Sequence, residues 1–404
     1  MLRFKKEDGS SYPDWEKLKF KVITIPYKVR NKQCKELEIY SINNQEGFVP
    51  QKEQFENAGY LKDTDTSIYM VVPPNHFAYN PARINVGSIG YQNIGYDVQV
   101  SSLYEVFRTT DKCNDKFLWY YFHTELFNKM VMKYGEGGVR VYYYYDKLCE
   151  TPIYLPCLEE QRKIADSLSA IDEKISLHES IVADYEELKK GTMQKIFNQE
   201  IRFKDDNREA YPNWKEYRLE RLTERVIVGL ATSVTPYYRE KGTPILRNMN
   251  IKKNYLDDSD MLYLDENYAK MQKGKKIKKG DVLTVHTGSN IGLTCMAPDK
   301  YVGALSFTTL ITTPKPELLD GRFLCQFMNF DTGISRINTL ITAGGKPNLN
   351  SGDLIHLKIP TPCIEEQKKI ADCLSALDMK IAAEKKILED WKQMKKALLQ
   401  QMFV

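Results

Sequence analysis

The first candidate for chemistry is a run of lysines in the second half of the chain. Six lysines fall between positions 270 and 279, and no acidic residue lies between 270 and 280. Such a patch can contact phosphate groups, which supplies affinity and salt dependence but no choice of sequence; an ordinary solvated loop has the same composition. The net charge of the chain is only +4, so any nucleic-acid surface must come from local patches. The candidate contacts are Lys273, Lys275, Lys276, Lys278 and Lys279.

Five further residues have side chains that suit phosphates or base edges. Arg140 and Lys346 are 206 positions apart, and each belongs to a glycine-containing segment, which puts a cation at equivalent places in two halves of the chain. Tyr142 opens a run of four tyrosines, of which strand alternation assigns about half to a core. Arg83 and Arg247 have asparagines nearby, and these two residue types match guanine and adenine edges in the major groove. The alternative for Tyr142 is packing in the core, and for Arg83 and Arg247 it is an ordinary surface position.

Catalytic signatures are absent from the sequence. There is no G-x-x-x-x-G-K-[ST] loop, because Gly345-Lys346 is followed by Pro347. The N-P-P-[YF] element of amino-methyltransferases is missing, and the five histidines lack metal-ligand spacing. A nuclease carboxylate cluster could be built only from Pro298-Asp299 and Glu366-Gln367-Lys368, and the second piece belongs to a repeated helix. We therefore expect no catalytic residues, no metal site and no cofactor bound by this chain.

The sequence segments that must position these candidates form an internal repeat. Residues 158–175 return at 364–381 with 13 of 18 positions identical, and three more are Leu/Ile or Arg/Lys exchanges. Arg3-Phe4-Lys5 returns as Arg202-Phe203-Lys204, each followed by a Tyr-Pro pair and a Trp. Between these markers the two halves have little in common. A repeated frame with two different inserts predicts one architecture that carries two recognition surfaces.

Residues 158–197 and 364–403 are predicted to form long helices. A proline precedes each, and two glutamates occupy the first turn, where negative charge suits the helix dipole. Apolar residues then recur every 3.5 residues over about three heptads, as in a coiled coil. Each helix would be about 60 Å long, and alone it would leave an apolar stripe in water, so we expect the two to pack antiparallel about a pseudo-twofold axis. The helix-start and seam residues are Glu160, Gln161, Ile164, Leu168, Ile175, Glu366, Gln367, Ile370, Leu374 and Ile381.

One polar position interrupts each apolar seam. It is His178 in the first helix and Glu384 in the second, at equivalent places near the midpoints of the helices. Midpoints meet in an antiparallel pair, so we hypothesise that His178 and Glu384 face each other and fix the register, as buried polar residues do in some coiled coils. The alternative is that both side chains point to solvent.

The segments outside the helices indicate two globular domains of α/β (α+β) class. They are rich in Tyr, Val and Ile and are punctuated by Gly, Pro and Asn. Strands are predicted at 67–74 and 281–286, and helical spacing occurs at 117–132 and 322–330. The predicted division is a first domain at 1–155, a long helix at 156–200, a second domain at 201–361 and a long helix at 362–404.

The bulk composition is that of a cytoplasmic protein. Eight cysteines include no C-x-x-C pair, which favours reduced thiols over a zinc ribbon or a redox site. The charged start of the sequence lacks a hydrophobic signal core, and no run of 18 apolar residues is present to span a membrane.

The repeated element resembles the conserved regions of Type I restriction-modification specificity subunits. That element is P-C-x-E-E-Q-x-K-I-A-D followed by a long amphipathic helix, and it is present twice. Several glycine-containing pieces are similar to parts of the same family's domains, and they are Gly87-Ser88-Ile89-Gly90, Gly280-Asp281-Val282-Leu283, Gly288 to Gly292 and Gly344 to Leu349. The resemblance covers essentially the whole chain.

The resemblance implies a specific division of labour. Each globular segment would be a target recognition domain that reads one half of a bipartite DNA sequence, and the paired helices would set the length of the unread spacer. The helices would also dock two methyltransferase subunits, which bind S-adenosylmethionine. Motor-nuclease subunits, which use ATP and Mg²⁺, would join that complex. The chain itself would have no catalytic activity.

The residues agree with this resemblance on independent grounds. A bipartite site needs two readers at a fixed distance and phase, because groove faces recur about every 34–36 Å, and stiff helices hold a distance that a flexible linker does not. Because the two inserts differ, the two half-sites should differ, which makes the target asymmetric. Two alternatives stay open: an autonomous enzyme such as a fused nuclease, and a coiled-coil adaptor or inactive cassette that does not bind DNA.

The repeat also predicts where the ends of the chain lie. The first helix ends near Phe197, shortly before Arg202, while the chain begins near Arg3 and its second helix ends near Phe403. The beginning and the end of the sequence should therefore lie close together, which would make the molecule nearly circular.

Overall fold

The computed structural model describes residues 2–44, 47–51, 65–137, 141–341 and 348–403. Its contacts divide the chain into two units, which are Met1–Ser180 with Lys386–Val404 (unit one) and Ile181–Lys385 (unit two). Each unit therefore contains one globular domain and about half of each long helix. The sequence-based division treated the helices as segments separate from the domains, whereas in the structure each half-helix packs with a domain.

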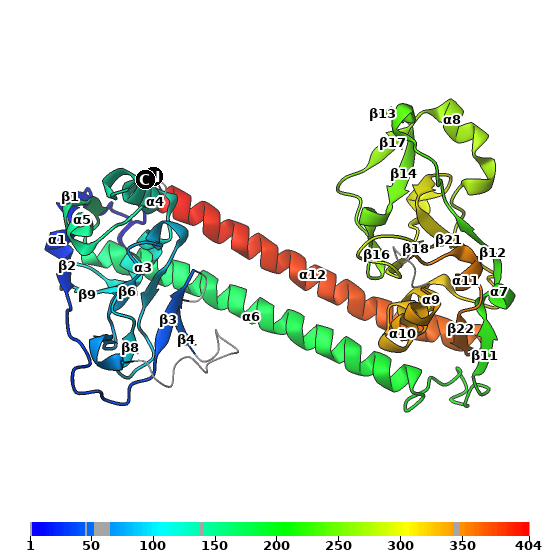
Figure 1. Ribbon diagram of the computed structural model, residues 1–404, viewed down its shortest axis with the longest axis horizontal. Coiled ribbons are helices and arrows are strands. Elements are labelled where there is room, and N and C mark those ends of the chain that lie inside the picture. The colour runs from blue at the N-terminus through cyan, green and yellow to red at the C-terminus, as the bar shows by residue number, and fades with distance from the viewer. Residues whose placement is uncertain (1, 45–46, 52–64, 138–140, 342–347, 404) are drawn as a thin grey trace. The chain divides into compact units, whose positions relative to one another are not determined.

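Two long helices, α6 (Leu158–Phe197) and α12 (Ile364–Met402), confirm the predicted ranges to within one residue. Within each unit the two half-helices run antiparallel (Figure 1). The ion pairs between them show this direction, since residue numbers increase along α6 while those of their partners on α12 decrease. In the described part of the chain, no helix combines the length and the apolar character needed to cross a bilayer. The ion pairs are Asp172–Lys395 and Glu179–Lys392 in unit one, and Glu186–Lys385 and Lys189–Asp378 in unit two.

The two globular domains contain the same four-stranded antiparallel sheet although their sequences differ. In unit one the strand order is β2-β9-β6-β7, and in unit two it is β12-β21-β18-β19. In both sheets the last of the four strands in sequence lies second in the order. The bounds are β2 Thr24–Pro26, β6 Phe77–Tyr79, β7 Ile89–Tyr91, β9 Glu105–Thr109, β12 Thr223–Val228, β18 Val282–Val285, β19 Thr294–Met296 and β21 Thr309–Pro314.

Helices that follow the sheet are repeated as well. Unit one has α3 (Asp115–Phe122) and α4 (Glu125–Tyr134), and unit two has α9 (Gly321–Met328) and α10 (Asp331–Leu340). The helical spacing predicted at 117–132 is confirmed but is divided between two helices, because the Thr124 side chain accepts from the Phe127 amide and starts a new helix there. The shorter helices are α1 Phe20–Ile23, α5 Tyr145–Glu150, α7 Leu219–Leu222, α8 Glu266–Met271 and α11 Ser351–Leu354.

Additional strands complete each domain. The strand predicted at 67–74 is the shorter β5, and the strand predicted at 281–286 is β18. In unit one the strands are β1 Glu16–Lys19 paired with β10 Pro152–Leu155, β3 Tyr40–Asn43 with β4 Gly47–Pro50, and β5 Met70–Val72 with β8 Val98–Val100. In unit two they are β11 Lys215–Arg218 with β22 Lys358–Thr361, β15 Ile251–Lys252 with β16 Tyr255–Leu256, and the sheet of β13 Tyr238–Arg239, β17 Leu262–Leu264, β14 Thr243–Arg247 and β20 Leu305–Phe307.

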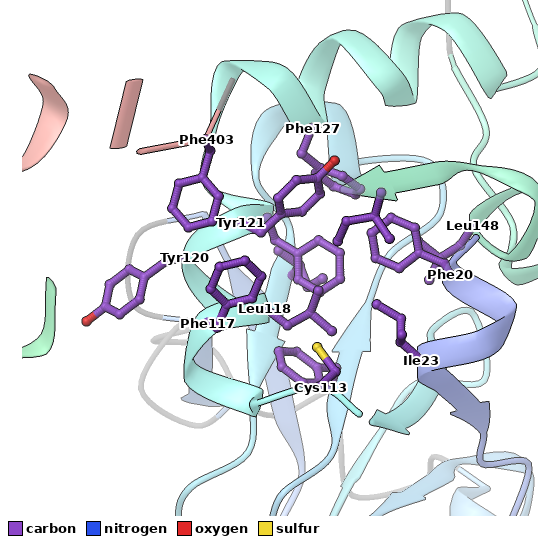
Figure 2. Close-up of a cluster of buried hydrophobic side chains, with 14 of the residues drawn as sticks. Phe20, Ile23, Cys113, Phe117, Leu118, Tyr120, Tyr121, Phe127, Leu148 and Phe403 are labelled. Carbon is purple, nitrogen blue, oxygen red and sulfur yellow. The ribbon is translucent and has the colours of Figure 1, made fainter. Parts of the chain in front are cut away.

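Each domain core incorporates both long helices. In unit one, Ile164 and Leu168 of α6 are buried among the aromatic side chains of α3 and α4, and Phe403 just beyond α12 packs against Phe117 with ring centroids 5.2 Å apart (Figure 2). In unit two, Ile370, Leu374 and Phe197 make the equivalent contacts. The seam residues Ile175 and Ile381, farther along their helices, are half-buried. The start of each apolar seam thus belongs to a domain core as well as to the helix pair.

Candidate nucleic-acid interface

The first helix of the pair is fastened to its domain by a buried carboxylate. Glu160 is fully buried and accepts two hydrogen bonds from the Arg3 guanidinium, at 3.1 Å from Nε and 2.9 Å from Nη2. The indole Nε1 of Trp15 donates to the same carboxylate at 3.2 Å. A buried carboxylate is stable only when it is paired and hydrogen-bonded, so the Arg-Phe-Lys and Trp markers serve to hold Glu160.

The second copy repeats this clamp atom for atom. Glu366 is fully buried and accepts from Arg202 at 3.1 Å from Nε and 2.6 Å from Nη2. Trp214 Nε1 donates to it at 3.0 Å. The two repeated sequence markers therefore belong to one structural device, which attaches the start of each long helix to the segment that opens its domain.

The glutamine that follows each glutamate is equally structural. The side chain of Gln161 accepts from the Asn114 amide at 2.7 Å, where α3 begins, and donates to the carbonyls of Lys112 and Pro156. Gln367 accepts from the Asp320 amide at 2.9 Å, where α9 begins. The prediction that Glu160, Gln161, Glu366 and Gln367 present a docking or coiled-coil surface does not fit their complete burial. Their polar atoms are used inside each domain, so they hold the helix in place.

Unit one contains an open cleft that gathers two of the predicted DNA contacts. Arg83 and Tyr142 both line it, together with Asn80, although 59 residues separate the two in sequence. Its volume is about 760 Å³. The cleft also includes two cations that the sequence reasoning missed, Lys28 and Arg30. Their spacing of two, which places both on one side of an extended segment, was the available signal.

The electrostatics of this cleft favour an anion. Lys28, Arg30 and Arg83 are exposed, and none of them forms an ion pair with another residue in the described part of unit one. Opposite charge comes from Glu105, whose carboxyl pKa is raised above its usual range because burial disfavours the ionised form, while Lys28 opposes that shift. The rings of Tyr142 and Tyr144 are stacked with an interplanar angle of 11° and centroids 6.0 Å apart. Unpaired cations beside a flat aromatic surface suit a sugar-phosphate backbone and its bases.

The lysine run of unit two is less available than its sequence suggests. The Lys275 ammonium donates to the Val228 carbonyl at 2.6 Å. Lys278 pairs with Glu224 and Lys279 with Asp299, each at 3.1 Å. Lys273 is exposed and Lys276 is half-buried, and neither is joined to a carboxylate elsewhere in the described chain. Three of the five predicted phosphate contacts, Lys273, Lys275 and Lys276, therefore keep charge that no described carboxylate neutralises, and the ammonium of Lys275 is held by a backbone carbonyl.

Arg247 and its neighbour Asn248 are tied into their own domain. The Arg247 guanidinium donates through Nη2 to the Asp260 carbonyl at 2.5 Å and to its carboxylate at 3.0 Å. The Asn248 amide donates to the Thr287 carbonyl at 3.1 Å. Reading a base edge would require Arg247 to leave these partners, so its prediction as a DNA contact has weaker geometric support than that of Arg83.

Three predicted sites stay untested by the geometry. Arg140 and Lys346 lie outside the described residues. His178 and Glu384 are half-buried and belong to different units, so their proposed pairing stays a prediction.

Comparisons with known proteins agree along nearly the whole chain. A profile of the family described as Type I restriction modification DNA specificity domain matches residues 6–187 and 213–392. The Type I restriction enzyme MjaVIII specificity subunit of Methanocaldococcus jannaschii is 23% identical over 414 residues, which cover 98% of this chain and 94% of that protein. Two solved structures share the fold. The S subunit of a Type I restriction-modification system from M. genitalium has a TM-score of 0.60 at 14% identity, over 97% of this chain and 96% of that chain. A chain solved in work on complex assembly and conformational transition of the type I R-M system has a TM-score of 0.55 at 17% identity, over 96% and 97% of the two chains.

Proposed function

Because the chain belongs to the Type I restriction modification DNA specificity family, we propose that it is the DNA-recognition subunit of such a system and that each globular domain binds one half of a bipartite, asymmetric site. The observation that carries this proposal is the repetition of one domain fold with two different surfaces. Two identical readers would suit a palindrome, whereas two unlike readers suit two unlike half-sites. The antiparallel helix pair supports a fixed spacing between them.

The cleft of unit one supports direct contact of that domain with DNA. Its three unpaired cations, Lys28, Arg30 and Arg83, would neutralise phosphates, and Asn80 with the tyrosines would meet the bases or sugars. In unit two, Lys273 and Lys276 would contribute phosphate contacts. The two surfaces differ in composition and in their place in the domain, as expected for readers of different sequences.

Catalysis belongs to partner subunits in this proposal. The curated relative is named a specificity subunit, and we expect this chain likewise to direct the complex without being an enzyme. Two methyltransferase subunits carrying S-adenosylmethionine would dock on the outer faces of the long helices, where exposed apolar residues such as Leu177 and Leu188 are available. Motor-nuclease subunits that use ATP and Mg²⁺ would join through that complex.

Methylome sequencing tests this function directly. Cells expressing the chain with its cognate methyltransferase subunit should acquire one new bipartite, asymmetric methylated motif. Replacing residues 1–155 with the corresponding domain of another family member should then change one half-site and leave the other half-site unchanged. An assembled complex that methylates no new motif would show that the chain is an adaptor or an inactive cassette.

A further inference from the structure

Each unit contains a three-residue polar junction where one domain meets both long helices. In unit one, Asp172 of α6 accepts from the Tyr120 hydroxyl of α3 at 2.8 Å and pairs with Lys395 of α12 at 2.6 Å. In unit two, Asp378 of α12 accepts from the Gln326 amide of α9 at 2.7 Å and pairs with Lys189 of α6 at 2.5 Å. Every member is displaced from its counterpart by 206 positions, so the repeat has kept the junction while one partner changed from Tyr to Gln.

We propose that these two junctions fix the rotational position of each globular domain on the helix pair, and that Asp172, Lys395, Asp378 and Lys189 are therefore positioning residues for spacer selection. This inference rests on the proposed function, because a spacer has meaning only for a bipartite DNA site. None of these residues needs to touch DNA.

The geometry of attachment supports a rotational role. Each domain is already held at the first helical turn by its Glu160 or Glu366 clamp. The junction lies 12 residues farther along the same helix, about 18 Å away at 1.5 Å per residue. One fixed point lets a domain swing about it, whereas a second point farther along the same helix restricts that motion, and the ion pair fixes this helix against its neighbour. The apolar contacts between them are non-directional, but hydrogen bonds lose strength steeply when their angles change.

Phase matters because the duplex is helical. With about 10–10.5 base pairs per turn, one inserted base pair rotates the second half-site by about 35°. A domain that turned freely on its helix could follow that rotation, and the complex would accept spacers of more than one length. A domain locked by directional hydrogen bonds cannot follow it, and therefore one spacer length is preferred.

The junction of unit two is the tighter one. The Lys189 side chain is 9% exposed against 30% for Lys395. Burial lowers the pKa of Lys189, and the partner Asp378 opposes that shift. The Asn254 amide donates to the Gln326 side-chain oxygen at 3.1 Å, which ties the turn between β15 and β16 to the α9 member of the junction. Arg322 adds a second link from α9 to Asp372 of α12. Disrupting unit two should therefore relax spacer choice more than disrupting unit one.

Spacer preference of the assembled methyltransferase complex tests the inference. Binding is measured to duplexes that carry the parental motif with its own spacer or with one base pair more or fewer. Lys189→Met with Asp378→Asn removes the ion pair while keeping side-chain volume. We expect the preference for the parental spacer to fall by about tenfold, with the recognised half-site bases unchanged. Lys395→Met with Asp172→Asn should lower it by a smaller factor.

A matched control separates positioning from general loss of stability. Lys385→Met with Glu186→Gln removes an exposed ion pair between the same two helices in unit two and should leave the spacer preference unchanged. If both junction variants assemble and keep the parental preference, the inference is wrong while the proposed function stands. A parental complex that prefers no bipartite duplex would overturn the proposed function and this inference with it. Should the unit-two variant fail to assemble, the more exposed unit-one pair decides by the same criterion.

Discussion

The Leu2 backbone amide donates a hydrogen bond to the Gln401 carbonyl at 2.8 Å, which joins the first described residues of the chain to the last turn of α12. The internal junction contains the same bond, from the Ile201 amide to the Lys195 carbonyl at 3.2 Å. Leu2 and Ile201 are equivalent at the 199-residue offset, and Gln401 and Lys195 are equivalent at the 206-residue offset. The same backbone hydrogen bond thus joins the start of the sequence to the end of α12 and the start of the second repeat to the end of α6. This confirms the sequence-based expectation that the two ends of the sequence lie close together (Figure 1).

A circularly permuted chain should therefore fold. We expect a chain opened between Gln199 and Glu200, with residues 404 and 1 joined through a short glycine-serine linker, to assemble with its partners and to melt within a few degrees of the parent, because no strand or long helix is cut. Size-exclusion chromatography and thermal unfolding check this. A second permutant opened inside β18 breaks a central strand and should be insoluble. If both permutants behaved alike, the repeat would not be the unit that folds.

Sequence periodicity predicted the parts of this fold that depend on local order. The heptad pattern from Ile164 and from Ile370 predicted both long helices, since a 3.5-residue repeat depends on neighbours along one helix. It could not predict that Glu160 is fully buried, because its partners Arg3 and Trp15 lie more than 140 positions away. Two glutamates at a helix start predict two exposed residues that stabilise the helix dipole, whereas in the structure Glu159 is exposed and Glu160 is buried.

Long-range partners also decided which candidate cations stay free. The lysine run contains no acidic residue, so its sequence predicts lysines without carboxylate partners. In the structure, Glu224 and Asp299 come from distant segments and pair with Lys278 and Lys279. The cleft cations Lys28 and Arg30 were missed because they form no dense run. For the junctions a signal did exist, since Asp172 and Asp378 are identical repeat positions and so are Lys189 and Lys395. The third residue of each junction differs between the repeats, Tyr120 in one and Gln326 in the other, so comparing the two copies could not identify it.

Removing the arginine of the buried clamp should destabilise the protein more than neutralising the Glu160 carboxylate. Arg3→Ala leaves the fully buried Glu160 carboxylate without its cation, and we expect the free energy of unfolding to fall by about 3–5 kcal/mol. Glu160→Gln should be milder, because Arg3 is partly exposed and can be hydrated. Denaturant unfolding measures both. Glu159→Gln, which alters the exposed neighbour, is the control and should have little effect. If Glu160 were hydrated in the folded protein, Arg3→Ala would lower the free energy of unfolding no more than Glu160→Gln does, and the buried clamp would be disproved.

The cations of the unit-one cleft should control the salt dependence of DNA binding. Arg83→Ala, alone and combined with Lys28→Ala and Arg30→Ala, should lower the slope of log K against log salt by roughly 0.9 for each phosphate that the variant no longer neutralises. The measurement is fluorescence anisotropy of the assembled complex across a salt series. Lys19→Ala removes a unit-one lysine already paired with Glu150 at 2.5 Å, so its slope should match the parent. An unchanged slope in the triple variant would remove this cleft from the DNA surface.

Glu105 supplies a pH-dependent test of the same cleft. Burial is the main cause of its raised carboxyl pKa, opposed by Lys28 and by the Tyr145 backbone amide, with Asp146 adding to the rise. Between the ordinary and the raised pKa, the folded protein binds more protons at this carboxyl than the unfolded chain does, so its contribution to stability falls as pH rises through that window. Above the window the folded state carries the full cost of the desolvated charge. Glu105→Gln removes that cost, and the variant should be at least as stable as the parent at pH 7, with the difference vanishing below about pH 4.

The same substitution should strengthen DNA binding, because it deletes the negative charge that faces the cleft cations. We expect affinity at pH 7 to rise about two- to fivefold at moderate salt, and the gain to shrink as pH falls and the parental carboxyl becomes protonated. Anisotropy titrations across a series of falling pH values separate this electrostatic effect from a change in shape, since a change in shape would alter affinity equally at every pH. A variant that binds less tightly at pH 7 would instead indicate that Glu105 accepts a hydrogen bond from a base amino group, as carboxylates do from cytosine.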